Sequence, residues 1–266
     1  MQKFSALFVN TLLKEFRSKT LMFLLFLTII VLLLVNSTMN FYLQLNSQNI
    51  SLSDSKLAVY FLIIIFWGIF LGAMLGSNCI KSDENDKMFD QFLSFPITRL
   101  EYLIARITGT WFIVICYYLF SIFAGIVILS NTAGVEGMYS KVCVAFFYNC
   151  LILLGVISFA ALYSLFTPKL IAFCMTILTY LFISLANGFV GPMGIDVVFQ
   201  SPGITNIAGK LIDYILPILG TLKTISNSII MDKQIEQNTG IEILHYVLTY
   251  SILFLLIWFI FNKKEI

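Results

Sequence analysis

Long apolar stretches without charged side chains constrain this chain more than any other feature. Six such stretches are separated by more polar segments, and each lacks Asp, Glu, Lys and Arg through its centre. An α-helix needs about 20 apolar residues to cross the roughly 30 Å hydrocarbon core of a bilayer. We therefore expect an all-α, polytopic membrane helix bundle with about six transmembrane helices. The expected spans are residues 20–35 (extending to 39), 57–80, 107–129, 142–166, 170–190 and 243–261.

The composition supports the same class. Hydrophobic residues make up 59% of the 266 residues and charged residues only 11%, whereas a soluble domain carries about 25% charged residues. A soluble fold could not bury so much apolar surface, but helix surfaces that face lipid can stay apolar. The net charge of +2 gives no indication of a nucleic-acid partner, and the five cysteines with one histidine form no metal-binding or disulfide pattern.

The distribution of basic residues predicts the orientation, because cytoplasmic loops carry an excess of Lys and Arg. With the N-terminus inside, the outer face receives only five of the sixteen Lys and Arg residues. We therefore expect both termini in the cytoplasm and the chain in the inner (plasma) membrane. The five outer residues are Lys56, Lys141, Lys210, Lys223 and Lys233.

Residues 1–19 are expected to form an amphipathic helix ahead of the first span. One narrow stripe of that helix is basic and polar, and another face is apolar. We expect the helix to lie flat at the inner membrane surface in contact with lipids; the alternative is a cytoplasmic helix packed on its own bundle. The stripe consists of Lys3, Asn10, Lys14 and Arg17, and the apolar face of Phe4, Phe8, Leu12 and Phe16.

The segment 81–106, between the second and third expected spans, is the most informative part of the chain. On a helix, Asp86 and Asp90 share one face because they are four residues apart, and an apolar face adjoins it. Pro96 must end that helix, and Thr98 can cap the helix that follows. The alternative is a loop folded back on the bundle. The apolar face consists of Phe89, Phe92 and Leu93.

The same segment resembles the signature of type-2 ABC transporter permeases. That signature is an acidic residue, two variable residues, Leu or Phe, Glu or Asp, a variable residue, two Leu, Ser or Ala, a variable residue, Pro, Ile or Val, Ser or Thr, and Arg, with a basic residue further on. Here it reads DKMFDQFLSFPITR from Asp86 to Arg99, followed by Tyr102 and Arg106. Lys87 is a departure, since the family usually has Gly there.

The resemblance implies the permease subunit of an ABC exporter, coupled through residues 83–99 to a separate ATPase subunit present in two copies. A second permease chain, either the same chain or a paralogue, would complete a dimer. In this family the loop forms a coupling helix that docks into a cleft of the ATPase. By position, Asp86 and Asp90 would pair with basic groups of the ATPase, Phe89 and Phe92 beside Leu93 would fill its apolar cleft, and Pro96 with Arg99 would fix the turn back to the bilayer.

ATP hydrolysis is expected on the partner chain. No G-x-x-x-x-G-K-[ST] loop that could cradle phosphates occurs in the sequence. We therefore expect a non-enzyme that binds no cofactor itself, with ATP and Mg²⁺ on the ATPase. One alternative is a membrane-embedded enzyme, for which the lone His245 supplies too few catalytic groups. Another is a secondary transporter or structural membrane subunit without an ATPase, which leaves the segment 81–106 unexplained.

The outer segment 191–242 is longer than a plain connection. In related permeases this position holds two short helices that dip into the membrane. We expect two short re-entrant helices broken near Pro217; the alternative is an additional hairpin of full spans.

Hydroxyl and amide groups in the fourth and fifth expected spans should join helices by hydrogen bonds, the alternative being a polar path between protomers. They are Asn149, Ser158, Tyr163, Thr176, Thr179, Tyr180, Ser184 and Asn187.

Overall fold

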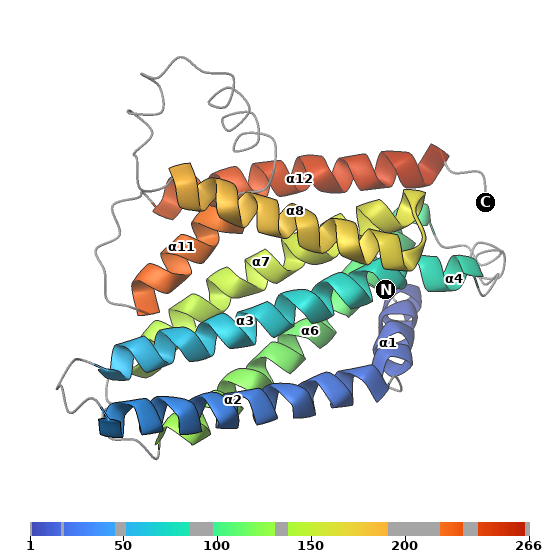
Figure 1. The fold of residues 1–266 in the computed structure, drawn as a ribbon. Helices are drawn as coiled ribbons and strands as arrows, with labels where there is room; N and C mark the ends of the chain where they lie inside the picture. Colours follow the sequence, from blue (N-terminus) through green and yellow to red (C-terminus); the bar gives the residue numbers. More distant parts are fainter. Residues whose placement is uncertain are drawn as a thin grey trace, which may run out of the picture.

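A computed structural model of the chain describes residues 2–16, 19–45, 52–85, 98–130, 138–190, 219–230 and 239–263. Regular secondary structure in these residues is helical throughout. The long helices run side by side, and α1 (Gln2–Phe16) lies across one end of them, where α12 (Thr239–Lys263) also ends (Figure 1). We call this end of the bundle the α1 end.

Five helices contain stretches long and apolar enough to cross a membrane, which fits a multi-pass membrane protein. The stretches lie in α2, α3, α6, α7 and α12, and α8 contributes a shorter apolar stretch within the described residues. The remaining bounds are α2 (Lys19–Leu45), α3 (Leu52–Cys79), α4 (Lys81–Asn85), α6 (Arg99–Ser130), α7 (Met138–Phe166), α8 (Lys169–Val190) and α11 (Leu219–Ile230).

The helix of the third expected span begins earlier than its apolar run, at Arg99 rather than residue 107. The Thr98 hydroxyl accepts a hydrogen bond from the Glu101 backbone N–H at 3.2 Å, and the Glu101 carboxylate accepts one from the Thr98 N–H at 2.9 Å. This reciprocal pair is a capping box, which satisfies backbone donors at a helix start. The predicted cap at Thr98 is therefore confirmed, and residues 99–106 belong to α6 rather than to a loop.

Helices α3 and α7 form the centre of the bundle. Their apolar stretches are 56% and 61% buried, against 22% for those of α2 and α12. Three glycines at four-residue spacing, Gly68, Gly72 and Gly76, face α7. A Cβ at Gly76 would lie 2.8 Å from the Ala160 Cβ and 2.9 Å from the Ile157 carbonyl oxygen. Glycine is needed there because the two backbones approach too closely for a side chain.

The fourth and fifth expected spans, which only residues 167–169 separate, form a tight hairpin. Helix α7 ends at Phe166 and α8 begins at Lys169. The Thr167 N–H donates to the Tyr163 carbonyl and the Ala172 N–H to the Pro168 carbonyl, both at 3.0 Å. The turn thus closes one helix and starts the next without a further linker.

Helix α11 lies within the outer segment 191–242, whose last four residues begin α12. The 12 residues of α11 extend about 18 Å, less than the roughly 30 Å needed to cross a bilayer. It packs on α7, where a Cβ at Gly155 would come within 2.7 Å of the Leu219 side chain. The predicted break near Pro217 and a second short helix lie outside the described residues.

Hydrogen bonds between helices confirm the expected use of several buried polar groups. Asn149 of α7 donates to the Tyr118 hydroxyl of α6 at 2.7 Å. Two further contacts join α7 to other helices: Ser158 to Tyr250 at 3.2 Å and Tyr163 to Thr179 at 2.8 Å.

Candidate functional site: a buried ionic cluster at the α1 end

Helix α1 packs along the first turns of α6. Leu7, Thr11 and Glu15, which are four residues apart, are all buried. Gly109 of α6 makes room for this face, because a Cβ at Gly109 would lie 3.1 Å from the Thr11 Cβ. The opposite side of α1 is exposed and apolar, with Val9, Leu13 and Phe16 each about half accessible.

The structure describes only part of the expected basic stripe and apolar face of α1. Lys14 turns toward α4, where its ammonium group binds Ser82 and Asp83. Phe8 is half-buried with its ring 5.9 Å from that of Phe112, whereas Phe16 is exposed. Packing against α6 therefore decides which side of α1 is covered. The side chains of Lys3 and Phe4 and the whole of Arg17 lie outside the described residues.

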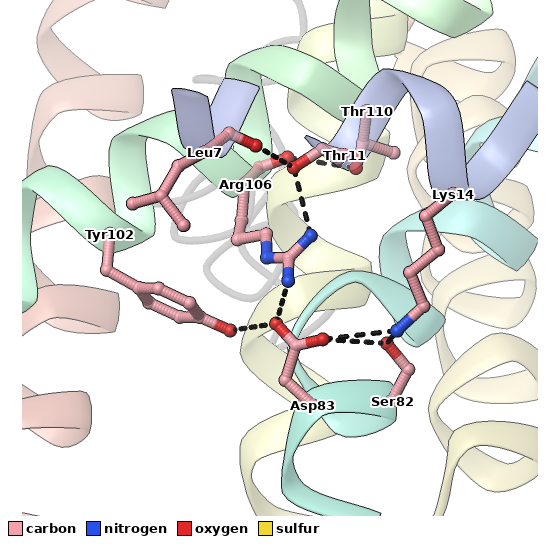
Figure 2. A network of polar contacts seen from close by, with 8 residues as sticks. All are labelled: Leu7, Thr11, Lys14, Ser82, Asp83, Tyr102, Arg106 and Thr110. Carbon is pink, nitrogen blue, oxygen red and sulfur yellow. Dashed lines mark hydrogen bonds and ion pairs between the residues drawn. The ribbon is translucent and has the colours of Figure 1, made fainter. Parts of the chain in front are cut away.

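Asp83 of α4 is fully buried and lies at the centre of a polar cluster (Figure 2). One carboxylate oxygen accepts the Tyr102 hydroxyl at 2.6 Å and pairs with the Arg106 guanidinium. The other accepts the Lys14 ammonium at 3.1 Å and the Ser82 hydroxyl at 3.4 Å. A carboxylate offers about four acceptor positions, so the contacts engage the full capacity of Asp83.

Arg106 is buried two turns inside α6, with 2% of its surface exposed. Its guanidinium donates to the Thr11 hydroxyl at 2.9 Å, and that hydroxyl donates onward to the Leu7 carbonyl of α1. A buried charge costs several kcal/mol unless it is paired and hydrogen-bonded. We use "buried ionic cluster" for Thr11, Lys14, Ser82, Asp83, Tyr102 and Arg106.

Glu15 lies beside the cluster and is buried on α1. Burial raises the pKa of its carboxyl group, because desolvation disfavours the charged form. Lys14, Arg106 and a hydrogen bond with Asn78 act in the opposite direction, and Asp83 adds to the rise. The carboxyl of Glu15 therefore holds its proton more readily than an exposed glutamate.

Arg99, at the start of α6, contacts the end of α12. Its guanidinium donates to the Asn262 carbonyl at 3.0 Å and to the Phe261 carbonyl at 3.4 Å. The last carbonyls of a helix have no partner within the helix, so Arg99 caps α12. The Tyr102 ring stacks on that of Phe261, with centroids 5.8 Å apart.

Arg99 is the one predicted ATPase-coupling residue that the structure describes. The others lie in the segment 86–97, outside the described residues: Asp86, Phe89, Asp90, Phe92, Leu93 and Pro96. The structure does describe what flanks this segment on each side, namely α4 with Asp83 and α6 with Tyr102 and Arg106.

The sequence indicated some members of the cluster but not the cluster itself. Tyr102 and Arg106 follow the permease-like motif, and Lys14 belongs to the expected basic stripe, but no sequence pattern brings these residues together with Asp83. No sequence motif singles out Glu15, although it lies four residues from Thr11 and eight from Leu7, which places the three on one side of a helix. Gly109 is a further usable signal, since a small residue marks where another helix can approach.

The charged side chains of the cluster form ion pairs with one another. The cluster therefore has a structural role, since it joins α1, α4 and α6. In the parts of the chain that the structure describes, no group of three or more His, Cys, Asp or Glu side chains could hold a metal ion. A scan of the sequence against protein-family models and a search of curated proteins both found no match.

Proposed function

We propose that this chain is the transmembrane permease subunit of an ABC exporter, driven by a separate ATPase. The motif of residues 86–99 carries this proposal, because it resembles the permease signature that docks on an ATPase. Supporting it, this motif follows directly after α4 and ends at Arg99, both at the α1 end. A docking segment between α4 and α6 is connected on each side to a helix of the bundle.

The helix lengths support a bundle of six spans. Helix α8 has 22 residues and therefore extends about 33 Å, enough to join the five long apolar helices as a span. Helix α11 is too short and lies within the outer re-entrant segment. The α1 end is the cytoplasmic one under the positive-inside rule, since it gathers Lys14, Lys19, Lys81, Arg99, Lys169 and Lys263.

Helix α1 then lies at the cytoplasmic membrane surface with its outer side toward lipid. Val9, Leu13 and Phe16 would enter the boundary between headgroups and acyl chains, where exposed apolar side chains of an interfacial helix are stabilised. Lys14 forms an ion pair with Asp83. Among the side chains of α1 that the structure describes, those that would contact the membrane are therefore apolar rather than basic.

Co-purification tests the proposal directly. The tagged chain is co-expressed with each candidate ATPase that carries a phosphate-binding loop, and the complex is reconstituted into lipid nanodiscs. We expect one such ATPase to co-purify and Phe89→Ala and Asp90→Lys to reduce its coupled activity at least tenfold, with membrane insertion unchanged. Phe166→Ala is the matched control, because Phe166 is an aromatic residue 67% exposed and is the last residue of α7. Helix α7 ends at the α1 end (Figure 1). Normal coupling in both loop variants would refute the assignment.

A secondary transporter is the second candidate, and the buried carboxyl groups of Glu15 and Asp83 favour it. Proton-coupled transporters use carboxyl groups buried among helices. Proton flux into proteoliposomes that contain this chain alone separates the two functions. A proton flux that wild type shows and Glu15→Gln lacks would support the secondary transporter. A permease without its ATPase is expected to show no proton flux.

A further inference from the structure

The two sides of the segment 86–97 are tied to each other by buried charge. Asp83 comes shortly before the segment and Arg106 shortly after it, and their side chains form an ion pair with exposures of 0% and 2%. Tyr102, also on the far side, donates to the same carboxylate at 2.6 Å. The two described elements that flank the segment, α4 and the first turns of α6, are therefore held together.

Helix α1 joins these two elements through two independent contacts. Lys14 binds Asp83 on α4, and Thr11 accepts a hydrogen bond from Arg106 on α6 (Figure 2). Thr11 also rests directly against Gly109, where no side chain separates the helices. Polar and steric contacts thus hold α1 to both helices that flank the segment.

We propose that Asp83 and Arg106 are positioning residues, which make α1, α4 and the first turns of α6 a single rigid unit that carries movement of the segment 86–97 into the bundle. This inference rests on the proposed function, in which that segment docks on the ATPase. In this unit α1 moves together with α6, and it does not detach during the transport cycle.

Rigidity follows from the number of contacts that hold the two buried charges. Each oxygen of Asp83 accepts two groups, and the Arg106 guanidinium contacts both Asp83 and Thr11. Hydrogen-bonded networks of buried polar groups rigidify their surroundings. A second arrangement would have to expose or unpair two buried charges, which is costly. The cluster is therefore suited to transmit displacement, not to switch.

The first test uses Asp83→Asn and Arg106→Gln, singly and together, in the nanodisc complex with the co-purified ATPase. Asp83→Asn removes the carboxylate that Arg106 and Lys14 share, and Arg106→Gln leaves Asp83 paired with Lys14 alone. The double variant leaves two neutral groups that can hydrogen-bond, beside a Lys14 ammonium that is one-third exposed. We expect each single variant to lower the coupled kcat at least tenfold, with the KM for ATP and the amount of bound ATPase within twofold of wild type. The double variant should recover to within threefold of wild type.

Two results of this test would overturn the inference. One is a normal kcat per assembled complex in the single variants, with only the yield of folded chain reduced, since the cluster would then serve folding alone. The other is a double variant no better than either single variant, because the ion pair would then not be the functional unit.

The second test links α1 to α6 directly and does not depend on removing charge. In Thr11→Cys/Gly109→Cys the two Cβ atoms would start about 3.1 Å apart, close to the roughly 3.5–4.5 Å of a disulfide. We expect the disulfide to form under mild oxidation and the coupled kcat of the oxidised form to stay within twofold of its reduced form. Wild type, with five free cysteines, is oxidised in parallel to measure effects of the oxidant.

A disulfide that forms but lowers the coupled kcat tenfold would show that α1 must move relative to α6, which overturns the rigid unit. Failure of the disulfide to form in the isolated chain would overturn the inference as well, and this readout needs no ATPase. Phe89→Ala separates the two proposals. If Phe89→Ala lowers the coupled kcat while the Asp83 and Arg106 variants do not, only this inference fails. If Phe89→Ala leaves the coupled kcat unchanged, the proposed function fails.

Discussion

The α1 end and the centre of the bundle bury polar side chains in different ways. At the α1 end the buried groups are charged and are paired across α1, α4 and α6, as Asp83 and Arg106 are. In the centre they are neutral: Asn149 donates to the Tyr118 hydroxyl, and the Tyr246 hydroxyl donates to the Leu151 carbonyl at 2.6 Å. Charge is expensive within a bilayer, whereas neutral groups cost little once hydrogen-bonded. The fold thus uses ion pairs to hold a peripheral helix and close neutral contacts to hold the central helices.

The largest expected effect comes from breaking the ion pair at the α1 end. Asp83→Leu leaves the Arg106 guanidinium buried without its carboxylate, and we expect a loss of about 3–5 kcal/mol in unfolding free energy. Unfolding by SDS titration, followed by circular dichroism, measures the loss.

The control for this substitution is Asp83→Leu/Arg106→Leu, which removes both charges. Replacing a buried ion pair by apolar residues is often neutral, so the double variant should be more stable than the single one. Equal instability of the two would mean that side-chain volume, rather than charge, decides stability here.

The next effect tests the close packing in the centre. Gly76→Ala puts a methyl group against the Ala160 Cβ and the backbone of Ile157, and overpacking of this kind costs about 1–3 kcal/mol. Gly72→Ala is the matched control on the same helix, since its methyl group would meet the Ile157 side chain at an ordinary 3.5 Å. Thermal unfolding in detergent should rank Gly76→Ala clearly below Gly72→Ala; the reverse ranking would contradict the close α3–α7 contact.

A smaller effect is expected from the neutral contact between α6 and α7. Tyr118→Phe and Asn149→Leu each remove one partner of a 2.7 Å hydrogen bond. Hydrogen bonds between helices in membranes are worth about 0.6 kcal/mol on average in double-mutant cycles, and we expect a coupling energy of that size. A coupling as large as that between Asp83 and Arg106 would remove the distinction between the two regions.

The smallest effect is a pH dependence at the α1 end. Because the pKa of Glu15 is raised by burial, its contribution to stability is present at low pH and is lost as the pH rises through the folded-state pKa. Lys14, Asn78, Asp83 and Arg106 face this carboxyl from α1, α3, α4 and α6. We expect Glu15→Gln to match wild type near the ordinary pKa of 4.5 and to exceed its Tm at higher pH. Equal Tm values at every pH would contradict the assigned shift.

The helices of the bundle are predictable because a membrane span requires only a local feature of the sequence. An apolar run of sufficient length is visible in the sequence whatever it packs against. The helix ends were less predictable, and α6 shows why: its start is decided by the exchange of hydrogen bonds between Thr98 and Glu101, not by hydropathy. Thr98 predicts a capped helix that leads into the span, whereas the apolar run alone begins only at residue 107.

The cluster was harder to predict because its members meet only through the fold. Asp83 and Arg106 lie on opposite sides of a segment, and a sequence pattern alone cannot say that the chain returns to the same place. Glu15 and Lys14 are neighbours in sequence, yet the first hydrogen-bonds with Asn78 of α3 and the second reaches α4. Which side of α1 is buried depends on Gly109, far along the chain.

The cap that Arg99 places on α12 has a consequence for biosynthesis. Helices emerge from the ribosome in chain order, so α6 enters the membrane long before α12 is made. During that interval the Arg99 guanidinium has yet to meet the Phe261 and Asn262 carbonyls that it binds in the finished protein. The contact can form only after α12 has been inserted in the correct direction. Arg99 therefore connects a helix that is synthesised early to one that is synthesised late. Its hydrogen bonds with α12 form only once this last described helix has been inserted.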